Sequence, residues 1–235
     1  MNGAALSENA AALGVQLTRV QLEAFALFEK FLYEANATMN LTLVPQDECW
    51  SRHFLDSLAI SPMIPKGSNV LDIGSGPGFP GACLAIARSD LRVTCIDSSN
   101  KAVSFMARVF GPNSTLPVLY QVINARAETA AHDSKLRESF DVVTGRAIAP
   151  FPVQAEISAA FVKVGGIFVP MRTPKERDEI AKFPAMRLGL HLSDFKTVRV
   201  AALGADRLFP NFAKKGKTPG EYPRGWSKIK ASPLS

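Results

Sequence analysis

The chain has 235 residues, of which 47% are hydrophobic, and its formal net charge is +6. This length suits one main domain with an appendage and excludes several full-sized domains, while the basic charge leaves a polyanionic partner open. A basic leader followed by an apolar stretch is absent, as is any run of eighteen apolar residues, so we expect a cytoplasmic protein that is neither secreted nor membrane-bound.

Two helices are predicted before residue 60. The first runs from Thr18 to about Ala35, because its apolar residues recur at spacings of three and four and a capping box stands at its start. The second runs from about Asp47 to Leu58, and the segment between the two contains the sequence MNLT. We therefore assign residues 1–65 to an N-terminal helical extension.

Strands then alternate with helices, which predicts a parallel sheet with helices on both faces. The predicted strands are 70–73, 92–96, 117–122, 140–144 and 166–171, and the helices between them are 80–88, 100–110, 128–137 and 153–162. After one more helix, two β-like runs at 197–203 and 207–214 are joined by a short turn, so we expect an antiparallel hairpin at the sheet edge. This makes an α/β domain of seven strands over residues 66–213, followed by a basic tail at 214–235.

The sequence VLDIGSGPGFPG follows the first of these strands and places four glycines within eight positions. Glycine is needed where a chain turns tightly or where a ligand approaches the main chain. No Walker loop is possible without Gly-Lys-Ser/Thr, and Phe79 stands where a dinucleotide fingerprint has its third glycine. Asp72, Gly74 and Gly76 fit D-x-G-x-G-x-G, the signature of S-adenosylmethionine binding in class I methyltransferases, so we expect this Rossmann-like fold class. A nicotinamide dinucleotide is the alternative ligand.

Three successive strand ends carry groups that complement S-adenosylmethionine. Asp72 supplies an anion for the ammonium group of the cofactor, directly or through water. Asp97 ends the second strand, where a carboxylate can accept hydrogen bonds from both ribose hydroxyls. Main-chain amides near Ala127 and Glu128, after the third strand, are placed to meet the adenine edge.

The end of the fourth strand, TGRAIAPF, favours methylation of a ring nitrogen. It lacks the Asn/Asp-Pro-Pro-Tyr/Phe motif of enzymes that methylate exocyclic amines, and it has no cysteine to attack C5 of a pyrimidine. Guanine N7 already presents a lone pair, so positioning and desolvation suffice without a general base. Arg146 is then a candidate for holding guanine or the cofactor, with a structural ion pair as the alternative. The three cysteines are too widely spaced for a metal knuckle, so we expect no bound metal.

The sequence resembles the bacterial 16S ribosomal RNA guanine-N7 methyltransferases, also called the glucose-inhibited division protein B family, over nearly the whole chain. The motifs that carry the likeness are MNLT at 39–42, RHFLDSL at 52–58, VLDIGSGPGFPG at 70–81, RAE at 126–128, GRAIAP at 145–150 and the YPR…PL ending. The resemblance implies methyl transfer from S-adenosylmethionine to a guanine N7. The implied partner is 16S ribosomal RNA or a small ribosomal subunit particle.

The resemblance also implies roles for individual residues. Those expected to contact S-adenosylmethionine are Gly74, Phe79, Ala127, Glu128 and Arg146. Those expected around the reacting base are Asn40, Arg52, His53 and Asp56, and the expected catalytic set, acting in chemistry or in positioning, is Arg146, His53 and Asn40. On spacing alone, a structural role is the commoner one for a histidine such as His53. The family usually has Lys-Gly where this chain has Arg172-Thr173, so Arg172 is left out of the predicted site.

Most of the basic excess lies in the tail. Residues 211–235 hold six Lys or Arg against one acid, interleaved or flanked by the aromatic residues Phe209, Phe212, Tyr222 and Trp226. This mixture suits an RNA backbone beside unstacked bases, with a solvated basic end as the alternative. Two rival functions stay open here: a small-molecule methyltransferase of the same fold, and a non-catalytic RNA-binding assembly factor.

Overall fold

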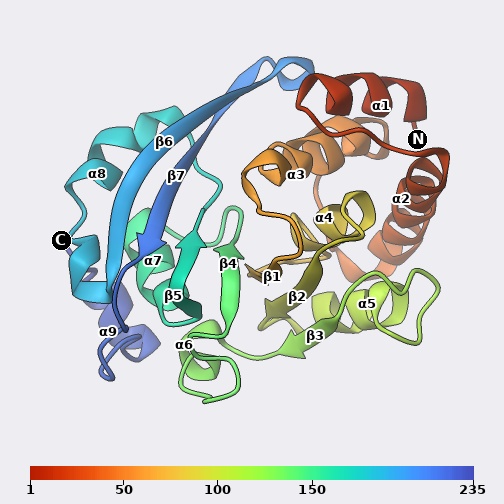
Figure 1. Ribbon diagram of the computed structural model, residues 1–235. Coiled ribbons are helices and arrows are strands. Elements are labelled where there is room, and N and C mark those ends of the chain that lie inside the picture. The colour runs from red at the N-terminus through yellow and green to blue at the C-terminus, as the bar shows by residue number, and fades with distance from the viewer.

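A seven-stranded sheet forms the centre of the computed structural model, which describes residues 1–235 (Figure 1). The strands are β1 (Asn69–Ile73), β2 (Arg92–Asp97), β3 (Gln121–Asn124), β4 (Phe140–Thr144), β5 (Val162–Phe168), β6 (Leu190–Val200) and β7 (Ala205–Lys214). Their order is β3-β2-β1-β4-β5-β7-β6. The first five pair in parallel, whereas β7 is antiparallel to both β5 and β6. The predicted parallel sheet with an antiparallel edge hairpin is confirmed.

Helices cover both faces of this sheet. They are α1 (Gly3–Ala12), α2 (Arg19–Met39), α3 (Asp56–Leu58), α4 (Gly81–Ala87), α5 (Asn100–Phe110), α6 (Ala127–Ala130), α7 (Phe151–Ala159), α8 (Arg177–Lys182) and α9 (Trp226–Ala231). Helices α1 to α5 share one hydrophobic core and α6 to α9 share the other. None of these helices has the length and apolarity that a bilayer crossing needs.

Adjacent residues of the inner strands point into these two different cores. In β1, Val70 packs with α1 to α5, whereas the next residue, Leu71, packs with α6 to α9. Strand β4 repeats the pattern with Val142 and Val143. Because both faces of a parallel sheet are covered, its strands are apolar at successive positions rather than at alternate ones.

The predicted helix at 47–58 is divided into three short elements. A 3₁₀ turn (Gln46–Glu48) leads into a π-helix (Trp50–Leu55), and α3 follows directly. π-helical turns are rare and concentrate at functional sites. This one carries Arg52 and His53, two residues of the predicted site.

Other differences from the prediction lie at the start of the chain, in the inner strand β5 and near the outer strands. Strand β5 covers Val162–Phe168 instead of 166–171. Helix α1 was not predicted, β3 begins at Gln121 instead of 117, and α6 has only four residues. Strand β6 begins at Leu190 instead of 197. It is an edge strand with mostly exposed polar side chains, so its sequence lacks the apolar run that marks an inner strand.

The β6–β7 hairpin links the two halves of the molecule. Figure 1 shows it, in blue, rising from the edge of the sheet and reaching over toward α1 and α3. Along its length, Val200 and Phe209 belong to the core of α1 to α5, whereas Leu208 and Phe212 belong to the other core. The hairpin thereby holds Arg207 beside α3, where it forms an ion pair with Asp56.

The tail and the preceding strand β7 are packed against the domain, which contradicts the RNA contact predicted for three of the four aromatic residues there. Phe209, Phe212 and Tyr222 are 0%, 1% and 7% exposed, so they complete the core and cannot stack on RNA bases. Lys214 is only 1% exposed, and its Nζ donates to the carbonyl oxygen of Ala159 at 2.6 Å. The other lysines of the tail, Lys215, Lys217, Lys228 and Lys230, are exposed to solvent.

Candidate active site

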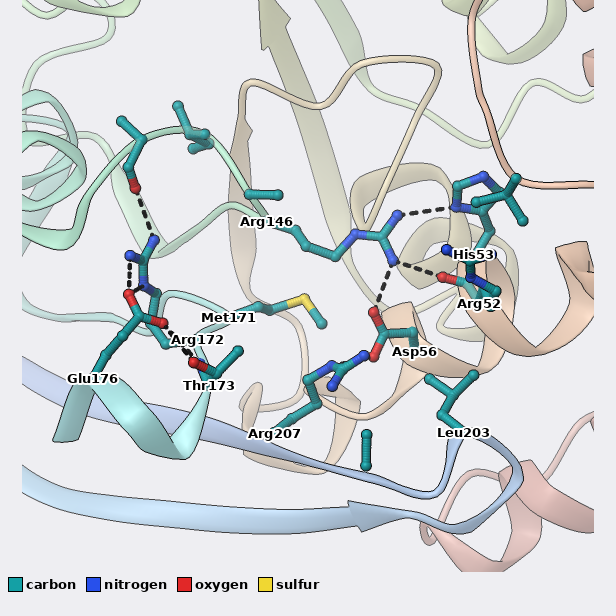
Figure 2. A pocket seen from close by; sticks show the side chains of 15 residues that line it. Arg52, His53, Asp56, Arg146, Met171, Arg172, Thr173, Glu176, Leu203 and Arg207 are labelled. Atoms are coloured by element: carbon teal, nitrogen blue, oxygen red, sulfur yellow. Dashed lines mark hydrogen bonds and ion pairs between the residues drawn. The ribbon is translucent and has the colours of Figure 1, made fainter.

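Two adjacent cavities open at the carboxyl ends of the parallel strands. The small cavity, of about 350 Å³, is lined by the ends of β1 and β2 and by the start of α6. The large cavity, of about 790 Å³, lies under the hairpin and is shown in Figure 2. Ala147 and Ile148 line both cavities, so the loop after β4 is the partition between them. Ligands in the two cavities would meet at this partition.

The glycine loop after β1 borders the small cavity. Gly74, Gly76 and Gly78 have φ angles of 62°, 52° and 115°, a left-handed backbone that L side chains rarely adopt. A Cβ at Gly74 would lie 3.0 Å from Cγ1 of Ile148, whereas one at Gly76 would meet nothing within 4 Å. The main chain is therefore bare where a ligand can approach it.

Asp97, at the end of β2, holds this loop and lines the small cavity. Its Oδ2 accepts a hydrogen bond from the main-chain N of Gly76 at 2.8 Å, and its Oδ1 accepts one from that of Ser99 at 2.7 Å. Each carboxylate oxygen can accept a second hydrogen bond. Asp97 can therefore fix the loop and still accept from ribose hydroxyls.

Asp72 lies beneath the loop rather than at the cavity surface. It is 0% exposed, and its Oδ2 accepts a hydrogen bond from the main-chain N of Gly81 at 2.7 Å. Its Oδ1 has no partner. Desolvation raises the pKa of this carboxyl to about 8, although the bond from Gly81 and the charge of Arg146 oppose the rise. Asp72 shapes the loop, and its contact with an ammonium group stays a prediction.

The far end of the small cavity is made by residues after β3. Ala127 and Glu128, the first residues of α6, line it together with Ile157 of α7 and Trp226 of α9. This wall combines apolar surface with main-chain and carboxylate groups, which suits an aromatic base with a hydrogen-bonding edge. Together with Asp97 at the end of β2 and the bare main chain of the glycine loop after β1, this wall makes a cavity whose residues fit S-adenosylmethionine.

Arginines dominate the large cavity. It is lined by four arginines and two acids: Arg52, Arg146, Arg172, Arg207, Asp56 and Glu176 (Figure 2). Nη1 of Arg146 lies 2.9 Å from Oδ2 of Asp56, and Nε of Arg207 lies 2.6 Å from Oδ1 of the same carboxylate. One buried carboxylate thus holds two guanidinium groups from distant parts of the chain. The positive excess favours a nucleotide over an apolar small molecule.

His53 lies on the face of Phe79, with ring centroids 4.1 Å apart and planes within 9° of parallel. Nη2 of Arg146 donates to Nδ1 of His53 over 3.1 Å, and Nε2 of His53 lies 2.7 Å from Oγ1 of Thr42. Because arginine cannot accept, Nδ1 is the accepting nitrogen and Nε2 carries the proton donated to Thr42. Burial, then the charges of Arg146 and Arg52, lower the pKa of His53 to about 3, so its ring is neutral.

No free general base therefore faces the large cavity. The lone pair of His53 accepts from Arg146, Asp56 is held by two arginines, and Glu176 is paired with Arg172. The cavity can bind and orient a substrate but offers no group to remove a proton from it. The chemistry it supports is reaction at an atom that already has a free lone pair.

Arg172, left out of the predicted site, braces the partition. Its Nη1 donates to the carbonyl oxygen of Ala149 at 2.9 Å and to Oε1 of Gln154 at 2.8 Å. Nε2 of Gln154 in turn donates to the carbonyl oxygen of Gly145 at 3.0 Å. These bonds hold both ends of the loop that separates the cavities, so Arg172 is a positioning residue.

The structure brings most predicted site residues to the two cavities but leaves Asn40, Asp72, Gly76 and Phe79 outside their linings. Asn40 ends α2 with a left-handed backbone, is exposed, and accepts a hydrogen bond from Nζ of Lys101 at its carbonyl oxygen. Phe79 is buried and supports His53 from below. A catalytic role for Asn40 and a cofactor contact for Phe79 stay predictions.

Besides Arg172, three residues at or beside the site were not predicted as part of it. Thr42, the partner of His53, stands in MNLT, and this motif was a signal that could have found it. Arg207 has no local signal, because its partner Asp56 is 151 residues away. Trp226 was assigned to RNA on account of the lysines around it, whereas it lines the small cavity.

The sequence comparisons agree on one family. The family model described as rRNA small subunit methyltransferase G matches residues 21–206. The Ribosomal RNA small subunit methyltransferase G of Lachnoclostridium phytofermentans is 36% identical over 227 residues, which cover 94% of this chain and 93% of that protein. The protein of the same name from Clostridium beijerinckii is 40% identical over 178 residues, 74% of each chain.

Solved structures share the fold at low sequence identity. M. jannaschii TYW2, solved in complex with AdoMet, matches with a TM-score of 0.51 and 17% identity, covering 68% of this chain and 74% of that one. A TehB-like SAM-dependent methyltransferase from Corynebacterium glutamicum matches with a TM-score of 0.50 and 17% identity, covering 81% and 99%. These likenesses show the class I methyltransferase fold.

Proposed function

The chain belongs to the rRNA small subunit methyltransferase G family, and from this premise we propose that it transfers the methyl group of S-adenosylmethionine to N7 of a guanine in 16S ribosomal RNA. The observation that carries the proposal is the meeting of two cavities at one partition. One has the bare glycine loop and the acid that fit the cofactor, and the other is rich in arginine and has no free base.

S-adenosylmethionine held by the glycine loop and Asp97 would supply an electrophilic methyl group to the N7 lone pair, with the electron pair of the C–S bond left on sulfur. No proton has to be removed, so the residues of the large cavity need only bind and orient the base. Arg146 is the central orienting residue. Three of its five N–H groups are used by Asp56, Arg52 and His53, which leaves two free. Since N7 must keep its lone pair, we expect the contact to be with guanine O6.

The proposed cofactor site follows the small cavity. Its residues are Gly74, Gly76, Asp97, Ala127 and Glu128, with Asp72 beneath the loop. Arg146 lines the large cavity and directly precedes Ala147 of the partition, and its contact with the cofactor is proposed on the family resemblance. His53 and Phe79 support Arg146, whose guanidinium carbon lies 5.3 Å from the centre of the Phe79 ring. Asn40 is proposed on family resemblance alone.

The proposed RNA surface includes four exposed lysines of the tail, Lys215, Lys217, Lys228 and Lys230. Their charges would neutralise phosphates and release counterions on binding. The RNA is either free 16S ribosomal RNA or the same RNA within a small ribosomal subunit particle. Both forms belong in the assay.

The test is methyl transfer from labelled S-adenosylmethionine to free 16S ribosomal RNA and to small-subunit particles, followed by digestion to nucleosides. We expect labelled N7-methylguanosine, and the form with the higher kcat/KM is the substrate. Arg146→Ala is the matched control and should lose transfer, with thermal unfolding as its check on folding. Label in a small metabolite instead would support a small-molecule methyltransferase, and cofactor binding without any transfer would support a non-catalytic RNA-binding factor.

A further inference from the structure

Trp226 lines the small cavity, although it lies far along the chain from the glycine loop. It is the first residue of α9 and faces the cavity together with Ala127, Glu128 and Ile157. We propose that Trp226 forms a wall of the adenine-binding end of the cofactor site, which makes the tail part of that site. This inference rests on S-adenosylmethionine being the cofactor.

The two cavities set the direction in which the cofactor lies. Ala147 and Ile148 line both cavities, so the methyl group, which must reach the substrate, belongs at this partition. Asp97 at the end of β2 then takes the ribose. Strand β3 lies beyond β2, on the side away from β1 and β4, so the adenine belongs at the end of β3. Arg126 follows β3, and its guanidinium carbon lies 5.8 Å from the centre of the Trp226 ring.

An ion pair that reaches into the domain fixes the backbone just before Trp226. Arg224 donates through its main-chain N and its Nε to Oε1 of Glu156, both at 2.9 Å, and through Nη2 to Oε2 at 2.7 Å. Glu156 is completely buried on α7. A buried carboxylate that accepts three hydrogen bonds from one residue anchors this segment tightly.

Two further side chains hold the residues that precede Arg224. Nε2 of His132 lies 2.9 Å from the carbonyl oxygen of Pro223, and Nη1 of Arg137 donates to that of Tyr222 at 3.0 Å. On the other side of Trp226, Ile229 of α9 is buried in the core. The tryptophan is thus held in place before a ligand arrives, which reduces the entropy that binding would otherwise lose.

The indole ring is suited to an adenine neighbour. It is partly exposed and packs against the core of α6 to α9, with Nζ of Lys230 6.0 Å from its centre. Base–aromatic contacts of this kind change affinity by about 5- to 100-fold on removal of the aromatic ring. In this position the ring serves the cofactor rather than an RNA base.

Fluorescence tests the contact without altering Trp226. The chain has two tryptophans, Trp50 and Trp226, so a Trp50→Phe protein emits from Trp226 alone. We expect its emission to change on titration with S-adenosylhomocysteine and with adenosine, and to stay constant with methionine, which has no adenine. A Trp226→Phe protein should show no such change. If saturating S-adenosylhomocysteine leaves the emission of Trp226 unchanged, the proposal is overturned.

Calorimetry provides the second measurement. We expect Trp226→Ala to weaken the binding of S-adenosylhomocysteine and of adenosine by the same factor, about 5- to 100-fold. Trp226→Phe should bind both ligands nearly as tightly as the unaltered chain does. The proposal would be overturned if Trp226→Ala bound S-adenosylhomocysteine more weakly but adenosine with unchanged affinity. It would also be overturned if this variant bound RNA more weakly but S-adenosylhomocysteine with unchanged affinity. If the unaltered chain does not bind S-adenosylhomocysteine, the assignment of S-adenosylmethionine as its cofactor is wrong. This result is distinct from a failure of the Trp226 proposal.

Discussion

Arg146 donates a hydrogen bond to Nδ1 of His53 over 3.1 Å. This bond uses the only lone pair of the neutral imidazole ring, whose other nitrogen is bonded to Thr42. The two side chains approach from elements 93 residues apart in the sequence. We therefore expect His53 to act on the reaction by positioning Arg146, not by moving protons.

Substitution of His53 separates these two roles. In His53→Gln the side-chain amide can still accept from Arg146 and donate to Thr42, so we expect kcat within about tenfold of the unaltered enzyme. His53→Ala loses both bonds and should lose more activity. The measurement is kcat and KM for both variants, with the pH profile between about 5 and 8. Equal losses of about 10²- to 10⁴-fold in both would identify His53 as a general acid or base instead.

The buried neutral His53 also makes stability sensitive to acid. The pKa of the ring is about 3 in the folded chain and about 6.5 in the unfolded one. Below about pH 6.5 the unfolded chain binds a proton that the folded chain does not. The free energy of unfolding therefore falls as the pH drops from about 6.5 toward 3, by up to about 1.4 kcal/mol per pH unit. Urea unfolding between about pH 5 and 7 should show this loss in the unaltered chain and not in His53→Gln; parallel curves would contradict it.

Arg207 should matter for catalysis because it shares Asp56 with Arg146. We expect Arg207→Ala to lower kcat/KM about 10- to 100-fold, since charge-assisted hydrogen bonds contribute about 1.5 to 3 kcal/mol. Arg199→Ala is the matched control: Arg199 is on the same hairpin, but its pair with Asp206 is 3.3 Å long and exposed, and such pairs contribute little. Kinetics with 16S ribosomal RNA and S-adenosylhomocysteine affinity are both measured. Equal effects of the two substitutions would exclude a role for the Asp56 pair.

Asp97 should control cofactor affinity. Asp97→Ala removes the carboxylate that accepts from Gly76 and faces the ribose position, so we expect S-adenosylhomocysteine to bind about 10- to 100-fold more weakly. Asp194→Ala, on the exposed edge strand, is the control and should bind normally. Calorimetry gives the affinities, and thermal unfolding should show both variants to be folded. An unchanged dissociation constant in Asp97→Ala would remove this residue from the site.

RNA affinity should depend on the exposed lysines of the tail, but truncation is the wrong way to test them, because the tail contributes buried side chains to the core. The variant needed changes Lys215, Lys217, Lys228 and Lys230 to Gln. Each lost phosphate contact should lower the slope of log affinity against log salt by about 0.7 on a single strand. The control protein changes Lys66 and Lys182, two exposed lysines outside the tail, to Gln as well. The same slope in all three proteins would show that the tail is a solvated end.

Most of the inner part of the fold could be predicted because its signals are local, although β5 begins at Val162, before the predicted 166. Strand β4 and helix α5 have the predicted bounds, and β1 and β2 differ by one residue. Their apolar runs reflect burial on both faces of the sheet. Strand β6 could not be placed as well, because an edge strand with polar side chains carries no such run. The π-helix before α3 has no sequence pattern of its own and depends on packing.

The site also has one part that could be predicted from local sequence and another that could not. The glycine loop and Asp97 could be identified because their spacing along a βα unit is itself the signal. The large cavity depends on contacts between distant segments, such as that of Asp56 with Arg207. No local pattern shows that the lone pair of His53 is already used, so its apparent suitability as a base was open until its neighbours were known.

The long separation of Asp56 and Arg207 has a consequence for how the enzyme becomes active. Their ion pair closes a loop of 151 residues, and contacts of such separation are slow to form because closure of the chain must precede them. A molecule in which the glycine loop is formed but the hairpin has not docked has no wall on one side of the large cavity. The large cavity is therefore complete only when the hairpin has docked, so the acceptor site cannot form before this long-range contact does.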